Sequence, residues 1–360
     1  MNSLKKLFAL VLALILALTP IGCKKQTYIE RVDYVFSSDM LLSISAYGVT
    51  HGDLDEMFEF ANDFNALINP KIPSSSIAIF NSMAVGEIQV DEHVYNLVQL
   101  AKNAWEETNG AFDVTISPLS ALWKVDNENL FAPHDHAMPT KQMLDEFSST
   151  ANGIDVKKAG EKYYIVKTHP SASLDLGGIA KGYLCDEIVK RLKDKNCISA
   201  LVDLAGNLAL LGNHINDKGQ EEVWKVGVKN PNGAGYLCGI NVSDSAVVTA
   251  GTYERYYEKD GVEYCHLINP FTKMPVGIVA NGENYENTTN HVISCSIWGL
   301  SGAQCDALAT ATCVLGLESG KRLLSQKNAN AIIVTADGKY TTVGNVSFMN
   351  GYEIEGLELV

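Results

Sequence analysis

The sequence contains few positive charges. It has 28 Lys and Arg against 42 Asp and Glu among 360 residues, which gives a formal net charge of −14. Because neutralising a phosphate backbone requires clustered cations, this balance argues against a protein that binds nucleic acid, although a nucleotide can still bind at a local site. The apolar fraction of 46% excludes a mostly disordered chain and is enough for a large core.

Apolar runs long enough to span a membrane are also lacking. Residues 7–18 form an unbroken apolar run of twelve residues, which is shorter than the roughly 20 residues of a membrane span. The run follows Lys5 and Lys6 and precedes Gly22 and Cys23, which is the arrangement of a bacterial lipoprotein signal. The alternative is an ordinary secretory signal with an incidental cysteine.

The lipoprotein interpretation divides the chain into three parts. They are a signal peptide over residues 1–22, a tether over 23–37 and a domain of two interleaved lobes over 38–360. Cleavage would leave Cys23 at the N-terminus as the site of lipidation. We therefore expect a protein of the cell envelope, anchored to the membrane by its lipid and facing the periplasm or the cell exterior.

The seven cysteines after Cys23 include no CxxC pair, which disfavours a zinc site. Their odd number excludes a full set of disulfides within one chain. We expect small buried residues, with one or two disulfides as the alternative. The seven are Cys185, Cys197, Cys238, Cys265, Cys295, Cys305 and Cys313.

Regular alternation of strands and helices is absent as well, and the sequence contains neither a GxGxxG fingerprint nor a P-loop. The hydrophobic patterns therefore predict an α+β fold rather than a doubly wound sheet, and they disfavour a dehydrogenase. Expected helices cover residues 53–67, 91–107, 179–192 and 301–315. Expected strands cover 40–47, 111–115, 200–211, 223–228 and 331–335, with a hairpin over 153–168 and two strands within 247–266.

Four short segments contain residues suited to chemistry. Asp175-Leu176-Gly177-Gly178 opens a predicted helix, whose free N–H groups, with Lys181 beside them, favour an anion such as pyrophosphate. In a second segment, Asp306 and Thr310 are four residues apart and share one helix face, so their oxygens suit Mg²⁺.

The other two segments supply a turn and a base. Gly110 and Ala111 permit close approach of a ligand, Phe112 offers a stacking face and Asp113 accepts hydrogen bonds. His266 ends a predicted strand, and an imidazole with its unperturbed pKa of about 6.5 could act as a general base. Taken singly, each segment also has a structural explanation as a turn, a cap or a buried polar residue.

Six strings together resemble the ApbE family, the FAD:protein FMN transferases. The strings occur in the family's order between about Met40 and Gly316. They are GAFDVTISPL, DLGGIAKGY, VDLAGNLALLG, TAGTYERYY, HLINP and DALATA. The resemblance implies an α+β, ApbE-like (T-fold-related) fold of mixed sheets with packed helices, and FAD in a cleft between two lobes.

The resemblance also implies residue roles. The implied FAD-binding residues are Met40, Asn69, Ala111, Phe112, Asp113, Asp175, Lys181 and Ile268. The implied Mg²⁺ ligands are the carbonyl of Gly178 and the side chains of Asp306 and Thr310, and His266 would deprotonate the acceptor hydroxyl.

The implied activity is Mg²⁺-dependent transfer of FMN from FAD to a Thr or Ser hydroxyl, with release of AMP. The implied partner is a flavoprotein subunit of an exported or membrane redox system. Two alternatives remain: an FAD pyrophosphatase that gives FMN and AMP, and a lipoprotein that binds FAD without chemistry.

The chain departs from the family pattern at several positions. Leu41-Leu42 replaces the Gly-Thr that usually follows the first methionine, and Asn69 or a neighbour replaces an aromatic residue. Lys273 stands where the family has the glycine of its PRTG string, and Ala309 replaces a second aspartate of some members. These changes suggest looser retention of the flavin.

Overall fold

The computed structural model describes residues 27–36, 40–124, 137–281, 284–288 and 291–360. Cys23 and the predicted signal peptide lie outside these residues. Among the described helices, none combines the length and apolar character needed to cross a membrane.

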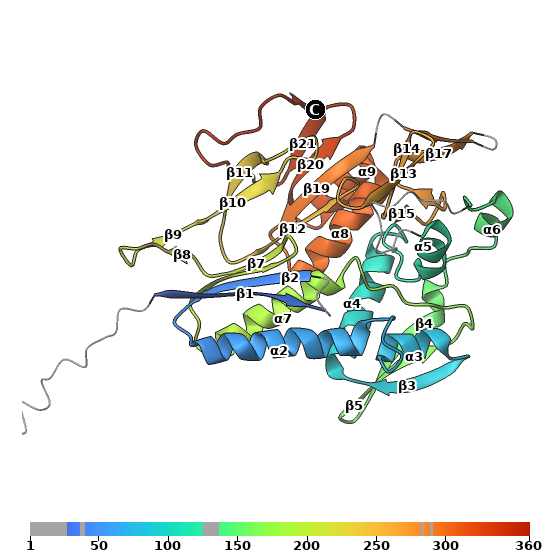
Figure 1. The fold of residues 1–360 in the computed structure, drawn as a ribbon, viewed down its shortest axis with the longest axis horizontal. Coiled ribbons are helices and arrows are strands. Elements are labelled where there is room, and N and C mark those ends of the chain that lie inside the picture. Colours follow the sequence, from blue (N-terminus) through green and yellow to red (C-terminus); the bar gives the residue numbers. More distant parts are fainter. Residues whose placement is uncertain (1–26, 37–39, 125–136, 282–283, 289–290) are drawn as a thin grey trace, which may run out of the picture.

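A nine-stranded sheet lies at the centre of the described structure (Figure 1). Its neighbours pair antiparallel except for the last two strands, which are parallel. In spatial order the strands are β1 (Tyr28–Val35), β2 (Met40–Tyr47), β6 (Ser199–Leu204), β7 (Asn207–Leu211), β12 (Ala246–Gly251), β19 (Val292–Trp298), β20 (Asn330–Thr335), β21 (Lys339–Val343) and β22 (Glu358–Leu359).

Helices cover one face of this sheet, and the core fills the space between them (Figure 1). The helices α2 and α7 pack on β1, β6 and β7, while α8 packs on β12 and β19. The helices are α2 (His51–Ile68), α3 (Ser76–Ser82), α4 (Glu92–Glu107), α5 (Ser117–Trp123), α6 (Lys141–Asp145), η1 (Ala151–Gly153), α7 (Ala180–Asp194), α8 (Gly302–Leu315) and α9 (Leu317–Gln326).

A small sheet of β10 (Trp224–Lys229) and β11 (Tyr236–Val242) packs on the opposite face. Successive side chains of a strand point to opposite faces. Val248 therefore belongs to the core beneath the helices, and Val247 to the second core with Trp224. Burial on both faces explains why β7, β12 and β20 read as nearly continuous apolar runs.

The remaining strands form a three-stranded sheet and several hairpins. A third apolar cluster joins α5 to the hairpin that precedes His266, through Trp123, Tyr257 and Tyr264. These strands are β3 (Gly86–Val90), β4 (Ile154–Ala159), β5 (Lys162–Lys167), β8 (His214–Ile215), β9 (Glu221–Glu222), β13 (Tyr256–Lys259), β14 (Val262–Cys265), β15 (Ile268–Asn269), β16 (Met274–Pro275), β17 (Ile278–Asn281) and β18 (Asn284–Asn287).

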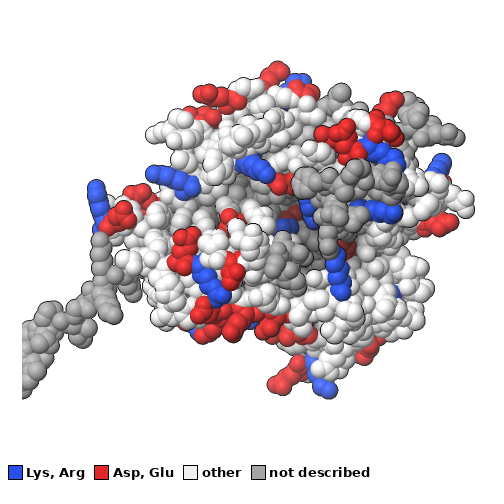
Figure 2. Space-filling model, viewed as in Figure 1, with Lys and Arg blue, Asp and Glu red and all other residues white. Residues whose placement is uncertain are grey.

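Acidic side chains gather over α2 on the face drawn in Figure 2. The exposed acids of this helix are Asp55, Glu56, Glu59 and Asp63. Lys195, which directly follows α7, pairs with Glu56, with 2.6 Å between Nζ and Oε2. The acidic balance of the composition is thus concentrated partly on one exposed helix face.

The predicted tether is wrong over Tyr28–Val35, which forms edge strand β1 and pairs with β2 along its whole length. Glu30, Arg31 and Asp33 make the segment resemble a polar linker. Charged residues are tolerated there because an edge strand exposes one side to solvent, and they oppose pairing with another chain.

The predicted extended segment 111–115 is also wrong, because it forms a turn. Asp113 Oδ1 accepts hydrogen bonds from the backbone N–H and the hydroxyl of Thr115, at 2.8 and 2.7 Å. Such a local bond competes with strand pairing.

The other expected elements are present, and the α+β fold is confirmed. Residues 200–211 are split into β6 and β7 by a turn in which Ala205 and Gly206 both have positive φ angles, 49° and 89°. The seven described cysteines are free and buried, as expected for small core residues.

Tyr28 provides a test of β1 as a structural strand. Its hydroxyl lies 2.6 Å from Ser199 Oγ and accepts a hydrogen bond from Ile215 N at 2.8 Å. We expect Tyr28→Phe to lower the unfolding free energy by about 1–2 kcal/mol, because Ile215 N–H loses its acceptor. Urea denaturation measures the change, and Tyr34→Phe, at an exposed position of the same strand, is the control. Equal effects of the two substitutions would contradict the assignment.

Candidate active site at the N-termini of helices α7 and α8

The helices α7 and α8 cross with their backbones in contact. A Cβ atom added to Gly182 would lie 2.1 Å from the carbonyl oxygen of Gly302, and one added to Gly302 would lie 2.6 Å from that of Gly182. No side chain fits at either position. The two glycines therefore set the distance between the helices that carry the predicted site residues.

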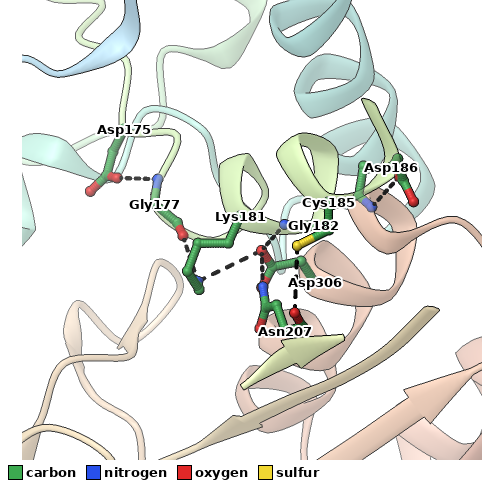
Figure 3. A network of polar contacts seen from close by, with 9 residues as sticks. Asp175, Gly177, Lys181, Gly182, Cys185, Asp186, Asn207 and Asp306 are labelled. Atoms are coloured by element: carbon green, nitrogen blue, oxygen red, sulfur yellow. Dashed lines mark hydrogen bonds and ion pairs between the residues drawn. The ribbon is translucent and has the colours of Figure 1, made fainter. Parts of the chain in front are cut away.

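Each helix supplies a carboxylate to the N-terminus of the other (Figure 3). Asp186 of α7 accepts from the N–H groups of Gly302 and Ala303, at 2.7 and 3.0 Å. Asp306 of α8 accepts from Gly182 N at 3.1 Å. The first N–H groups of a helix have no hydrogen-bond partner within the helix, so each carboxylate supplies an acceptor that is otherwise lacking. The positive end of the helix dipole also attracts the negative charge of the carboxylate.

The capping of α8 is complete. Ser301 Oγ accepts from Gln304 N, and Ser301 O accepts from Cys305 N, while Asp186 takes the two remaining N–H groups. Burial raises the pKa of Asp186 to about 6, although the two N–H bonds oppose this shift. The position of α8 along its axis is thus defined by a carboxylate of α7.

Asp306 is 4% exposed, and its Oδ2 atom receives all the polar contacts that described residues make to the side chain. Gly182 N and Asn207 Nδ2 donate at 3.1 and 3.0 Å, and Lys181 Nζ lies 3.7 Å away (Figure 3). None of the described residues donates to Oδ1, which leaves this oxygen for a further ligand.

Gly178 lies against two predicted site residues. A Cβ atom added there would lie 3.1 Å from Phe112 Cε2 and 3.3 Å from Thr310 Oγ1. The backbone of the Gly-Gly turn can approach Thr310 and Phe112 only because Gly178 has no side chain. The structure therefore brings together the turn, the hydroxyl one helical turn beyond Asp306, and a predicted flavin contact.

These donors fit a magnesium ion. A carboxylate, a hydroxyl and a backbone carbonyl are hard oxygen ligands, and Mg²⁺ commonly keeps several waters beside one or two carboxylates. Among the described residues, no group of three or more His, Cys, Asp or Glu side chains gathers into a metal site. Asp306 is thus the one protein carboxylate in the predicted set.

The loop before α7 is fixed by Asp175. Its Oδ1 accepts from Gly177 N at 2.9 Å, and its backbone N–H donates to Val114 O at 2.8 Å. Lys181 Nζ donates to Gly177 O at 3.3 Å. The Asp175 loop and the segment that begins at Ala111 are therefore held side by side.

Ala111, Phe112 and Asp113 are all buried, with exposed fractions of 2, 4 and 6%. Asp113 Oδ1 is occupied by Thr115, but Oδ2 is buried and has no hydrogen-bond partner among the described residues. A buried carboxylate oxygen without a donor is costly. Asp113 is therefore poised to accept a hydrogen bond from a ligand.

His266 is half-buried, and its imidazole has a defined orientation. The Nδ1 atom lies 3.1 Å from Arg255 O, so it carries the proton that it donates to this carbonyl. The Nε2 atom then carries the lone pair that a base requires. Burial lowers the pKa of His266 to about 3, and the positive charges of Arg255 and Lys181 contribute to this shift.

The segment after His266 keeps a tight turn without the family's glycine. Lys273 has a left-handed φ of 66°, which costs a non-glycine residue about 1 kcal/mol. Its N–H donates to Asn269 O at 2.7 Å, and its carbonyl accepts from Trp123 Nε1 at 2.8 Å. These two bonds hold the lysine in the conformation that glycine adopts freely.

Three predicted FAD-binding residues occupy other surroundings. Met40 is half-buried at the start of β2, next to the β6–β7 turn that leads to Asn207. Asn69 ends α2, and its side chain bonds locally to Asn65 and Lys71. Ile268 is 7% exposed and packs in the third apolar cluster.

Asn207, Asp186 and the carbonyl of Arg255 are not among the site residues predicted from the sequence. Asn207 and Arg255 lie in two of the strings that resemble the ApbE family, VDLAGNLALLG and TAGTYERYY. Their place in these strings was the signal that could have marked them as site residues. Nothing in the sequence near Asp186 indicated that it caps a helix more than a hundred residues away.

Comparison with solved structures places this fold. The flavin transferase ApbE of Vibrio cholerae aligns with a TM-score of 0.71 over 89% of this chain and 97% of that chain, at 22% identity. The ApbE protein of Thermotoga maritima aligns with a TM-score of 0.73 over 87% of this chain and 96% of that chain, at 24% identity. The described chain therefore has the fold of ApbE flavin transferases, as the sequence predicted.

Sequence comparison then identifies the family. The FAD:protein FMN transferase of Treponema pallidum is 32% identical over 285 residues, covering 77% of this chain and 75% of that protein. The FAD:protein FMN transferase of Klebsiella pneumoniae is 28% identical over 283 residues, covering 78% and 81%. Residues 38–333 match the ApbE family. The chain belongs to the ApbE family.

The contact between Gly182 and Gly302 predicts a large effect of one methyl group. We expect Gly182→Ala to lower the unfolding free energy by about 3 kcal/mol, because the new Cβ collides with a backbone carbonyl that cannot rotate away. Chemical denaturation measures the loss. In the control Gly52→Ala, also within a helix, the new methyl would lie 3.7 Å from Thr50 Oγ1, an ordinary contact distance, so we expect no loss. A change below about 0.5 kcal/mol in Gly182→Ala would contradict the close crossing.

The environment of His266 predicts its titration. With a pKa of about 3 the imidazole is neutral above about pH 5, so its NMR signals should not shift between pH 5 and 8. Arg255→Gln removes a nearby cation but keeps the carbonyl, so it should move the midpoint upward. The signal is assigned by its loss in His266→Gln. A midpoint near 6.5 in the unsubstituted protein would contradict the described environment.

Proposed function

We propose that the chain transfers the FMN moiety of FAD to a Thr or Ser hydroxyl of an exported or membrane redox protein and releases AMP. The observation that carries this proposal is the meeting of Asp306, Thr310 and Gly178 at the N-terminus of α7. The relatives from Treponema pallidum and Klebsiella pneumoniae are FAD:protein FMN transferases, which supports the same reaction.

The proposed phosphate site lies at the start of α7. The positive end of the α7 helix dipole and the ammonium of Lys181 would favour the negative charge of a pyrophosphate. Mg²⁺ held by Gly178 O, Asp306 and Thr310 would act there as a Lewis acid on phosphoryl oxygens. The buried Oδ2 of Asp113 would accept a hydrogen bond from the flavin, and Phe112 would contact it.

The proposed base is Nε2 of His266. It takes the proton of the acceptor hydroxyl, whose oxygen then forms a bond to the phosphorus of the FMN moiety. The bond from that phosphorus to the bridging oxygen breaks, and the electron pair leaves with AMP. Arg255 O stabilises the imidazolium that forms, because it accepts the Nδ1 proton.

We further propose that a lipid on Cys23 anchors the chain in the cell envelope, where acceptor subunits of membrane or exported redox systems are in reach. The lipoprotein pattern of residues 1–23 supports this location. Strand β1 begins at Tyr28, so only a few residues separate the proposed lipid from the folded domain. The domain would therefore work close to the membrane surface.

The test uses the lipid-free chain from residue 24 with FAD and Mg²⁺, with and without a flavoprotein subunit that carries a Thr flavinylation site. AMP release and flavin fluorescence of the denatured acceptor are followed together. We expect His266→Gln to slow transfer by 10²- to 10⁴-fold, the usual contribution of a general base. Asp306→Asn should weaken the response to Mg²⁺.

Control variants and alternative outcomes make this test decisive. His169→Gln replaces an exposed histidine and should leave transfer unchanged. AMP release without labelled acceptor would favour an FAD pyrophosphatase over a transferase. Binding of FAD without either product would favour a flavin-binding lipoprotein and overturn the proposal.

A further inference from the structure

Asn207 is a buried polar residue at the centre of the site. It is 3% exposed and begins β7, directly after the two-residue turn of Ala205 and Gly206. Its backbone carbonyl accepts from the thiol of Cys185 in α7 at 3.4 Å. The turn, the strand and α7 therefore fix its backbone, and its side chain projects from a rigid base.

The amide of Asn207 faces the carboxylate of Asp306 (Figure 3). Nδ2 donates to Oδ2 at 3.0 Å, and the two residues are 99 positions apart in the chain. Because a carboxylate only accepts hydrogen bonds, the nitrogen end of the amide must point toward it. A neutral donor at this position binds one carboxylate oxygen without adding negative charge to the site.

The two donors to Oδ2 and the nearby ammonium of Lys181 leave the two oxygens of Asp306 in different surroundings. Gly182 N and Asn207 Nδ2 hold Oδ2, and Lys181 Nζ lies beyond them at 3.7 Å. Oδ1 has no donor among the described residues. Two donors from separate elements, one on α7 and one on β7, prevent rotation of the carboxylate about its Cβ–Cγ bond.

We propose that Asn207 is a positioning residue that orients the Asp306 carboxylate for a divalent cation. The identity of the cation rests on the proposed function, in which Gly178, Asp306 and Thr310 are the ligands and Asn207 has no role. Residues that hydrogen-bond a metal ligand typically change metal affinity by 10- to 100-fold when they are removed. Asn207 should therefore act on cation binding more than on the subsequent reaction.

The first measurement is direct binding of a cation, without FAD turnover. Binding of Mn²⁺ to the lipid-free chain is followed by electron paramagnetic resonance, and Mg²⁺ is titrated as the competitor. We expect Asn207→Ala to raise both dissociation constants by 10- to 100-fold. Asn207→Ser, which retains a shorter donor, should give an intermediate value and serves if the alanine variant folds poorly.

The second measurement separates cation binding from the reaction. At saturating FAD, the Mg²⁺ concentration that gives half the maximal AMP release should rise with the dissociation constant. The rate at saturating Mg²⁺ should fall less than threefold. A purely structural role would lower the amount of folded protein and the maximal rate without moving the Mg²⁺ midpoint.

The control and the charged variant complete the test. Asn241 lies in β11, outside the site, and its amide donates to Phe348 O at the same distance of 3.0 Å. Asn241→Ala should therefore leave cation binding unchanged. Asn207→Asp should weaken binding, because two carboxylates then repel each other across Oδ2. Tighter binding in Asn207→Asp would identify position 207 as a direct ligand and overturn the positioning role.

Two further results would also overturn the inference. One is unchanged Mn²⁺ binding in Asn207→Ala, and the other is no measurable cation binding in the unsubstituted protein. Failure of the proposed transferase activity is a separate outcome, because the resonance measurement reports cation binding whether or not FAD is turned over.

Discussion

The mutual capping of α7 and α8 is the constraint on which the site depends. Each helix leaves N–H groups unpaired at its start, and each receives a carboxylate from the other, Asp186 in one direction and Asp306 in the opposite one. Gly182 and Gly302 permit the close crossing that makes both bonds short. Because the helix ends face each other, the Gly-Gly turn before α7 and the Thr310 side chain of α8 meet at one place. The hydrogen-bond acceptors that the N-termini of the two helices require therefore also bring the predicted metal ligands together.

Local charge at this place is opposite to the charge of the whole chain. The chain has a formal net charge of −14, part of which lies on the exposed face of α2. At the site, Lys181, Arg255 and the start of α7 provide positive potential, and the charges of Arg255 and Lys181 add to burial in lowering the pKa of His266. A pyrophosphate with its cation would be attracted to such a site without any large basic surface. The acidic composition and a nucleotide substrate are therefore compatible.

The structure also shows how the chain tolerates departures from the family pattern. Lys273 keeps the left-handed turn after His266, because Asn269 and Trp123 bind its backbone. Asn69 replaces an aromatic residue and bonds to its own helix end. The first change preserves the backbone path near the proposed base. The second leaves a polar side chain whose bonds are to Asn65 and Lys71, and the looser retention of flavin stays a prediction from the sequence.

The sequence by itself determined the elements with a clear hydrophobic period, the α+β class, and the presence of Asp306 and Thr310 on one face of one helix. These follow from spacings of two to four residues, which local geometry dictates. It did not determine β1, whose charged residues resemble a linker, or the turn at Asp113, where a side chain competes with strand pairing. Only the tertiary structure decided that Asn207 and Asp186 face α8, 99 and 116 residues along the chain from the groups they bind. Such pairs depend on how the sheet and helices pack, and no local pattern records that packing.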